Sequence, residues 1–509
     1  MGQGAADRAS DGQNADTGDG PEGGLGHALG LTVASAVVWG VAHVFAGRRV
    51  VGFLLMGLFA TLAGGVIVVV LDFPGSLRQI AVRRDWLAGI TVAILVLALV
   101  WATVVVRSYQ VVRPRALAGA ARVLAGGLVM VLAVGICAPL VWAARDTYTL
   151  RDTIGTIFHG DEARPHVVNV ADPWKDRPRV NILLLGGDGA GDRIGVRTDS
   201  MTVASIDTKT GNTVLFSLPR NLQHFPMVQR LRSRWPDGFT GVGAPGDVGL
   251  LNELYQDAEE DASLVPGFGK GRRGPELVRE EISYLIGQPI DYYVLVNLFG
   301  FADIVDAMGG AKVHIAQDIP FGGPEDGSAP TGVLKTGDRM LDGKQALWFG
   351  RSRTASSDFV RMGRQKCLMK AIAEQADPQK VLISFQRLAS AAKKTISTNI
   401  PAALLPALVQ LSGTMKRGAQ VTSLMFVPPQ FHVVRPDIDV FQRAAAKAIA
   451  AGEEQSATSA SPDASADPSV SATPSVSESP TAGESPSESS SAGPEQSKTK
   501  AVSLSAACG

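Results

Sequence analysis

The densest group of chemically capable side chains lies between residues 351 and 365. Four arginines fall within fourteen residues, surround one acid and precede a glutamine: Arg351, Arg353, Asp358, Arg361, Arg364 and Gln365. A guanidinium group presents paired N–H donors that match two phosphate oxygens, so partly buried arginines in this density favour a bound pyrophosphate. The alternative is a solvated basic face or a contact with anionic lipid. Apolar residues at 359, 360 and 362 interrupt the cluster and argue against that alternative.

The start of a helix is predicted inside this group. Asp358 precedes a helical pattern of apolar residues and is a candidate N-cap. Arg361 and Arg364 are three residues apart, so they share one face of the predicted helix. The sequence therefore predicts that a helix presents part of the arginine cluster.

Two acids upstream suggest a metal site. Asp188 follows the apolar run 180–185 in a Gly-Gly-Asp-Gly turn, and Asp199 opens the next β-rich run. Hard carboxylate oxygens at the edge of neighbouring strands can share Mg²⁺ (or Mn²⁺). The alternatives are a plain turn at Asp188 and a turn acid paired with Arg197 at Asp199. The glycine-rich turn matches neither a Walker loop nor a dinucleotide fingerprint.

A further arginine stands at a predicted strand end. Arg220 follows Pro219, which ends a strand, and in that place its guanidinium can fork onto phosphate. An ordinary surface arginine is the alternative. The sequence contains no GxSxG or HExxH motif, and Cys367 falls among apolar helix positions. These observations favour phosphoryl transfer by arginines and a metal over covalent catalysis.

The elements that position these side chains are predicted to form an α/β fold. Strands are expected at 180–185, 201–206, 213–218, 291–298, 312–316 and 421–427. Helices are expected at 275–286, 301–308, 343–350, 359–374, 401–411 and 441–451. Interleaved strands and helices predict a mixed β-sheet flanked by helices, an α/β/α arrangement.

An N-terminal helical transmembrane region precedes this domain. The runs 50–71, 87–106 and 123–144 are apolar and uncharged, and about 20 such residues span a bilayer. A weaker run at 28–47 either spans or lies in the interface, so three spans are expected and four are possible. The spans hold no acid or base of a transport path, which favours an anchor over a transporter.

Basic residues predict the orientation of the anchor. Six arginines lie before the first span or between the second and third, and three lie in the loop between the first and second: Arg48, Arg49, Arg107, Arg113, Arg115 and Arg122 against Arg78, Arg83 and Arg84. The positive-inside rule places the six in the cytoplasm and everything after Ala144 outside the cell membrane. The 48 basic and 48 acidic residues give no net charge, which argues against nucleic acid as a partner.

The composition predicts five segments along the 509 residues. They are a disordered tail at 1–27, the transmembrane region at 28–144, an extracytoplasmic stalk at 145–178, one folded soluble domain at 179–450 and a disordered Ser/Pro/Ala-rich tail at 451–509.

In their order and spacing, these motifs resemble the LytR–CpsA–Psr family of cell-wall glycopolymer transferases. The stretches that carry the resemblance are NILLLGGD, RTDSM, FSLPRN, LNELY, GQPIDYYVLVNLFGFADIVDAMGG, MLDGKQALWFGRSR and DFVRMGRQ. The resemblance implies transfer of a glycan from a polyprenyl-pyrophosphate carrier to a peptidoglycan sugar hydroxyl, forming a phosphodiester. A transcriptional attenuator and a module that only binds or hydrolyses the carrier remain alternatives.

The resemblance also implies roles for the residues. Asp188 and Asp199 would hold Mg²⁺, and Asp358 would orient an arginine or take a proton. Together with Asp358, the catalytic residues would be Arg220, Arg351 and Arg361, which also clamp the pyrophosphate. The substrate would be bound by Arg197, Asn252, Arg353, Arg364 and Gln365. One departure is Asn221, where the family usually has an acid.

Overall fold

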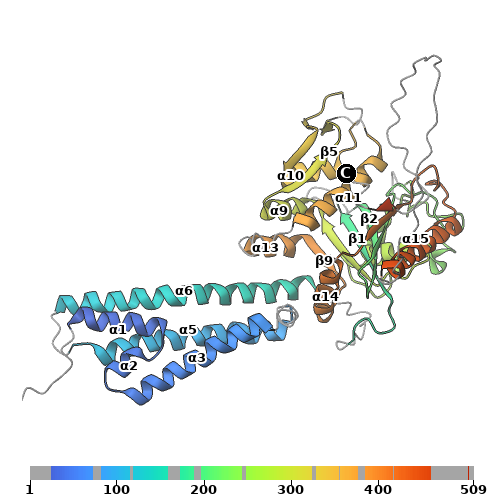
Figure 1. Ribbon diagram of the computed structural model, residues 1–509. Coiled ribbons are helices and arrows are strands. Elements are labelled where there is room, and N and C mark those ends of the chain that lie inside the picture. The colour runs from blue at the N-terminus through green and yellow to red at the C-terminus, as the bar shows by residue number, and fades with distance from the viewer. Residues whose placement is uncertain are drawn as a thin grey trace, which may run out of the picture. The chain divides into compact units, whose positions relative to one another are not determined.

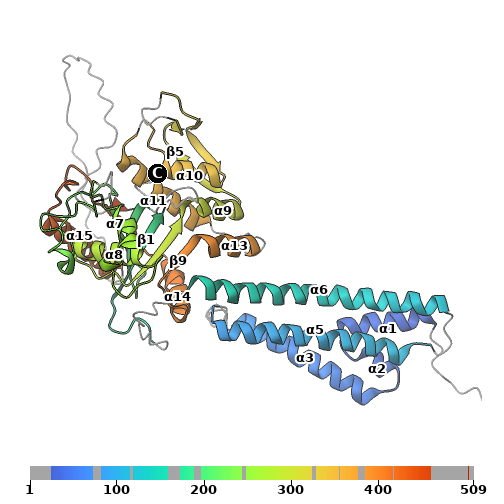
Figure 2. The same ribbon diagram turned by 180° about the vertical axis from the view of Figure 1, so that it is seen from behind.

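We describe a computed structural model of the chain (Figures 1 and 2). The structure describes residues 24–72, 82–114, 119–158, 172–187, 197–243, 248–323, 328–354, 356–375, 385–416, 418–459 and 502–503. The chain divides into two compact units, residues 1–77 with 85–148, and residues 78–84 with 149–509.

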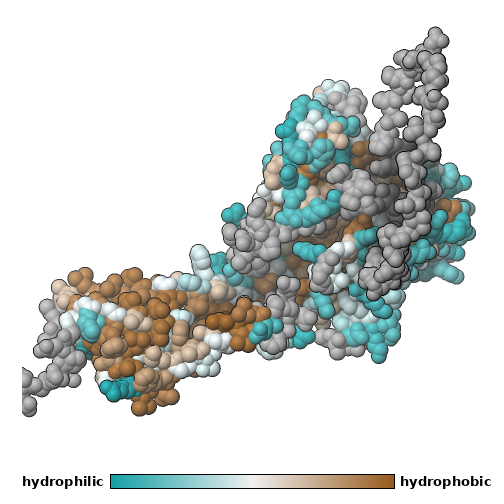
Figure 3. Space-filling view, in the orientation of Figure 1, coloured by the Kyte–Doolittle hydropathy of each residue, from teal (hydrophilic) through white to brown (hydrophobic). Residues whose placement is uncertain are grey.

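The first unit is built from apolar helices. They are α1 (Leu25–Val37), α2 (Val41–Phe45), α3 (Arg49–Asp72), α5 (Arg84–Val112) and α6 (Gly119–Ile157). Three of them, α3, α5 and α6, are long and apolar enough to cross a membrane. Exposed apolar side chains cover them, such as Leu99 at 69% and Trp142 at 74% exposure (Figure 3). Such a surface is typical of helices that face lipid.

The weaker apolar run at 28–47 does not form one long helix. It breaks between α1 and α2 at Gly40, where φ is +94°. A Cβ atom there would meet the carbonyl oxygen of Gly52 at 2.2 Å, so only glycine fits the turn. The resulting 13-residue α1 is too short to span a bilayer, which agrees with the expectation of three spans rather than four.

A seven-stranded mixed sheet forms the centre of the second unit. Its strand order is β11 (Val502–Ser503), β10 (Val421–Met425), β3 (Thr213–Leu218), β2 (Thr198–Asp207), β1 (Arg179–Gly187), β4 (Tyr292–Asn297) and β9 (Ile396–Thr398). Strands β1, β2 and β3 are antiparallel neighbours, whereas β4 pairs parallel to β1 and β10 parallel to β3. A hairpin turn around Thr210-Gly211-Asn212 joins β2 to β3.

Helices pack on both faces of this sheet because its side chains alternate between two cores. Leu183, Val203 and Phe216 point to one core, which also contains side chains of α8 (Arg273–Ile286) and α15 (Ile438–Ser459). The residues next to them in sequence, such as Ile182 and Ala204, point to the other core with α14 (Leu405–Lys416). The predicted α/β fold with a mixed, helix-flanked sheet is confirmed.

A small lobe with its own core adjoins the sheet. It consists of α9 (Leu298–Met308), β5 (Ala311–Ile315), β6 (Ile319–Phe321), β7 (Gly332–Leu334), β8 (Gly337–Leu341), α10 (Gly343–Arg351) and α11 (Asp358–Gln375). Asp342 begins α10 in a capping box with Gln345, which satisfies the first N–H groups of the helix. Helix α10 ends at Arg351 and α11 begins at Asp358, two residues predicted for the site.

The remaining elements are shorter or lie at the boundaries. They are η1 (Gln229–Leu231), α7 (Leu254–Glu260), η2 (Ala262–Leu264), α13 (Phe385–Thr395) and η3 (Ala402–Leu404). Helix α6 runs to Ile157, into the predicted stalk, and α15 runs to Ser459, past the expected boundary at 450. Most of the two predicted tails lies outside the described residues.

Candidate active site

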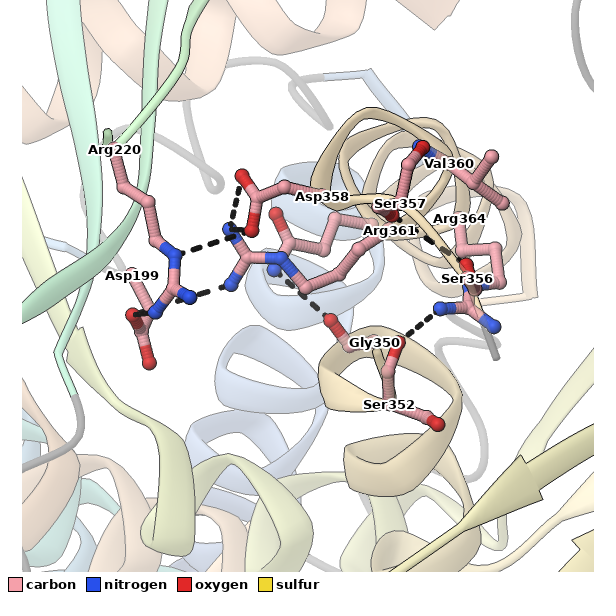
Figure 4. A network of polar contacts seen from close by, with 11 residues as sticks. Asp199, Arg220, Gly350, Ser352, Ser356, Ser357, Asp358, Val360, Arg361 and Arg364 are labelled. Atoms are coloured by element: carbon pink, nitrogen blue, oxygen red, sulfur yellow. Dashed lines mark hydrogen bonds and ion pairs between the residues drawn. The ribbon is translucent and has the colours of Figure 1, made fainter. Parts of the chain in front are cut away.

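Two acids and two arginines from three separate elements form a closed polar network (Figure 4). Arg220, just after β3, bonds to Asp199 on β2 through Nη1 and lies 3.1 Å from Asp358 Oδ1 through Nε. Arg361 Nη2 is 3.1 Å from the same Asp358 oxygen, and its Nη1 is 4.0 Å from Asp199 Oδ1. Each arginine therefore faces both carboxylates.

The antiparallel pairing of β2 and β3 positions the first half of this network. Met201 is paired with Leu218, so the start of β2 and the end of β3 lie at the same edge of the sheet. Pro219 then ends the β3 ladder, and Arg220 follows it past the sheet edge. The sequence prediction that Arg220 projects from a strand end agrees with this placement.

The start of α11 positions the second half. The cap prediction was wrong by one residue, because Ser357 Oγ accepts the hydrogen bond from Val360 N at 3.3 Å and Asp358 is the first helical residue. Asp358 thus has its carboxylate free for Arg220 and Arg361. An acid in the first turn also interacts favourably with the helix dipole.

Burial disfavours the charged forms of Arg361 and Arg364. Arg361 is only 2% exposed, and burial lowers its pKa although Asp358 opposes the shift. Burial lowers the pKa of Arg364 to about 10, with a further contribution from Arg361. For Arg220 burial also acts downward, but Asp199 and Asp358 outweigh it and its pKa is raised. Buried cations of this kind are stabilised by anions.

Several polar atoms at the site have no partner within the described part of the chain. They are Nε of Arg361, Nε of Arg364 and Oδ1 of Asn252 and Asn221. The backbone N–H of Asn252 donates to Arg220 O at 3.1 Å, which places this 3% exposed residue beside the network. Buried polar groups are normally paired, so these atoms are donors and acceptors that the described chain leaves unsatisfied.

Two of the predicted ligand-binding residues make structural contacts. Arg364 donates to Ser352 O, and Gln365 Nε2 donates to Gly350 O at 3.0 Å. Both bonds fasten α11 to the end of α10, where the last carbonyls lack helical partners. The amide nitrogen of Gln365 is therefore already hydrogen-bonded, whereas Nε of Arg364 has no partner in the described chain.

The other predicted residues lie around this network. Arg351 is the last residue of α10, and Arg353 follows two residues later; both are half-buried. Arg197 is exposed and directly precedes β2, whereas Asp199 forms ion pairs with Arg220 and Arg361. Asp188 lies outside the described residues.

Two residues near the site were not predicted to act in it. Asn221 was expected only to differ from the family pattern, although its position next to Arg220 already suggested a place in the site. Lys366 on α11 donates to Ser423 Oγ at 2.8 Å, and burial lowers its pKa to about 8. A single lysine after Arg364-Gln365 carries no sequence signal for such burial.

Asp199 suits a hard metal ion as one ligand of a larger set. Its Oδ1 is taken by Arg220, and its second oxygen points away from both guanidinium groups (Figure 4). Among the described residues there is no group of three or more His, Cys, Asp or Glu placed to hold a metal. Mg²⁺ commonly uses one or two carboxylates and completes its shell with water and phosphate oxygens, so the donor chemistry fits.

Known proteins have sequences similar to this one. The model of the LytR–CpsA–Psr family matches residues 154–431, more than half of the chain. The TagU polyisoprenyl-teichoic acid–peptidoglycan teichoic acid transferase of Bacillus cereus (strain AH820) is 29% identical over 234 residues, which are 46% of this chain and 64% of that protein. The protein of the same name from Oceanobacillus iheyensis is 28% identical over 254 residues, 49% of this chain and 68% of that one. This chain thus spans less than two thirds of the length of the Bacillus cereus protein.

Solved structures are similar at lower identity. The crystal structure of Bacillus subtilis TagV is 22% identical, covers 55% of this chain and 98% of TagV, and has a TM-score of 0.37. The protein gbs0355 from Streptococcus agalactiae is also 22% identical, covering 50% of this chain and 79% of that one with a TM-score of 0.37. On the match to residues 154–431, the chain belongs to the LytR–CpsA–Psr family.

Proposed function

We propose that the protein is a membrane-anchored transferase that moves a glycopolymer from a polyprenyl-pyrophosphate carrier to a sugar hydroxyl of peptidoglycan. The observation that carries the proposal is the network of Asp199, Arg220, Asp358 and Arg361. Its buried guanidinium groups and orphan N–H donors suit a compact anion with several oxygens. The names of the relatives give the class of donor and acceptor.

The arginines would bind the pyrophosphate and stabilise the charge that develops on it. Phosphate oxygens would accept from Nε of Arg361 and Arg364, which have no partner in the described chain. Charge grows on the leaving phosphate during transfer, and donors already fixed in a low-dielectric site stabilise it with little reorganisation. The network would therefore contribute to the rate as well as to binding.

The reaction would be a single displacement at phosphorus. The acceptor hydroxyl oxygen forms a bond to the glycan-bearing phosphorus, and the bond from that phosphorus to the bridging oxygen breaks. Polyprenyl phosphate leaves, and the product is a glycan–phosphate–sugar diester. The polyprenyl phosphate keeps the electron pair of the broken bond.

Asp358 would receive the hydroxyl proton. In the structure its carboxylate is held by Arg220 and Arg361. Once phosphate oxygens bind one of these guanidinium groups, the carboxylate would lose part of its ion pairing and be available to the hydroxyl proton. Proton uptake would then follow binding of the donor.

Magnesium would be held by Asp199 together with Asp188. The ion would neutralise charge on the bound phosphates, as divalent cations do in phosphoryl transfer. Manganese, which also prefers oxygen ligands, would substitute.

The direct test is transfer by the full chain in detergent. A polyprenyl-pyrophosphate glycan and soluble peptidoglycan oligosaccharides would be supplied with Mg²⁺. Polyprenyl phosphate and phosphodiester-linked glycan should appear in equal amounts. Polyprenyl phosphate with free glycan phosphate would instead identify a hydrolase, and the absence of both products from a chain that binds the donor would identify a binding module.

A further inference from the structure

Two aromatic side chains of the small lobe stack on each other. Trp348 on α10 and Phe321 at the end of β6 have ring centroids 5.3 Å apart and planes tilted by 25°. Both are half-buried. Phe321 borders the core of the small lobe, whereas Trp348 does not belong to that cluster of described residues. Part of the indole is therefore exposed to solvent without serving the core.

One residue, Ser352, connects the aromatic pair to the arginines. Its carbonyl accepts from Arg364, and its hydroxyl donates to the carbonyl of Pro320, the residue before Phe321. Its backbone N–H donates to Trp348 O at 2.8 Å. The segments that carry the two rings are thus tied to the same point as Arg364.

The orientation of Phe321 depends on the absence of a side chain at Gly332. A Cβ atom built at Gly332 on β7 would lie 2.4 Å from Phe321 Cζ. Gly332 therefore lets the phenyl ring lie against the neighbouring strand, and Trp348 stacks on that ring. Within the described part of the chain, this ring packing is what positions the indole.

An aromatic pair that Ser352 ties to the segment held by Arg364 matches a ligand with two chemical parts. Phosphate oxygens satisfy the arginines, and the C–H face of a sugar ring buries apolar area against an aromatic ring. A sugar joined directly to phosphate presents both parts a few ångströms apart. A bare polyprenyl phosphate presents the charge without the ring.

We propose that Trp348, supported by Phe321, is the stacking platform for the donor's phosphate-linked sugar ring. The inference rests on the proposed function, since it assumes that the arginines bind the donor's pyrophosphate. Trp348 would select for a sugar on the carrier, while the arginines select for the phosphates. The pair would also hold the sugar-bearing phosphorus in a fixed orientation.

Binding by the full chain in detergent separates these two roles. The probes are inorganic pyrophosphate, sugar-free polyprenyl pyrophosphate, polyprenyl-pyrophosphoryl N-acetylglucosamine and soluble peptidoglycan oligosaccharide. Trp348→Leu should weaken binding of the sugar-bearing carrier by about 3- to 10-fold, the range for one aromatic contact. Binding of pyrophosphate and of the sugar-free carrier should not change. Trp348→Phe should retain most of the affinity.

Three outcomes would overturn the platform. The first is that Trp348→Leu binds the sugar-bearing carrier with unchanged affinity. The second is that its binding of the sugar-free carrier weakens equally, which would indicate a lipid contact. The third is that only the peptidoglycan oligosaccharide binds more weakly, which would indicate an acceptor site. Trp174→Leu is the matched control, because Trp174 is half-buried against the separate core that contains α14. If Trp348→Leu does not fold, Phe321→Leu should show the same selective loss. Failure of the wild-type chain to bind pyrophosphate would instead contradict the proposed function.

Discussion

Arg220 Nε lies 3.1 Å from Asp358 Oδ1, although 138 positions separate the two residues in the chain. This contact joins the end of β3 to the first residue of α11, and so joins the sheet to the small lobe. Asp358 also holds Arg361, and the two arginines share Asp199 on the other side. The two carboxylates therefore hold the guanidinium groups of Arg220 and Arg361 in position before any anion binds.

Asp358→Asn should separate positioning from folding. The asparagine keeps the shape but loses the charge that orients both arginines and the group that accepts the hydroxyl proton. We expect turnover to fall by about 10²- to 10⁴-fold, the range for general acid–base and electrostatic contributions. Steady-state transfer with circular dichroism as a folding control would measure this. A folded variant within a few-fold of the wild-type rate would remove Asp358 from the mechanism.

Asp199→Asn should change the metal requirement. The carboxylate contributes a hard oxygen to Mg²⁺ in our proposal and also an ion pair to Arg220. The variant should need a higher Mg²⁺ concentration for half-maximal rate, and chelator should stop the wild-type enzyme. Full wild-type activity in chelator would show that Asp199 serves only to hold the arginine.

Fusions to a reporter that is active only outside the membrane should report the orientation of the anchor. A fusion after Leu150 should be active because the arginine distribution places the chain after Ala144 outside. A fusion after Pro114, between the second and third spans, is the matched control and should be silent. The reverse pattern, with equal expression, would remove the cell-wall assignment altogether.

Glu281 should make stability depend on pH without affecting the reaction. It is fully buried on α8, accepts from Val228 N at 3.0 Å and leaves Oε1 without a described partner. Burial raises its pKa to about 8, above an ordinary value of 4.5. The folded state therefore holds a proton that the unfolded state releases, and stability should fall as pH rises from about 4.5 to 8.

Glu281→Gln should flatten that part of the profile, because the amide does not ionise. Denaturant unfolding at several pH values would measure it, with transfer activity as the control that should stay unchanged. A profile as steep as that of the wild type would show that Glu281 is not the titrating group.

The sequence predicted the strands and helices that carry the site better than it predicted which of their side chains come together. Unbroken and alternating apolar runs identified β1 to β4, since local pattern follows burial on a sheet. The contact of Asp199 with Arg361 depends on how the small lobe packs, and no local pattern encodes that. The cap was misplaced from Ser357 to Asp358 because both residue types cap helices well. The family resemblance placed Gln365 at the ligand, and its hydrogen bond to Gly350 O was not foreseen because helix periodicity does not reveal a neighbouring helix end.

The central claim is that the buried arginines act on the transferred phosphate, and Arg361 tests it most directly. Arg361→Ala should lower turnover about 10²- to 10³-fold, by analogy with loss of an oxyanion-hole donor. Arg361→Lys should recover little, because an ammonium group cannot fork onto two oxygens. Arg443→Ala, on an exposed position of α15, is the control and should be neutral.

The measurement is the steady-state rate of phosphodiester formation by the full chain in detergent, with unfolding monitored for each variant. The account predicts a folded Arg361→Ala protein that forms product 10²- to 10³-fold more slowly, roughly the loss expected for one electrostatic contact. A folded Arg361→Ala protein with a rate equal to that of Arg443→Ala would contradict it.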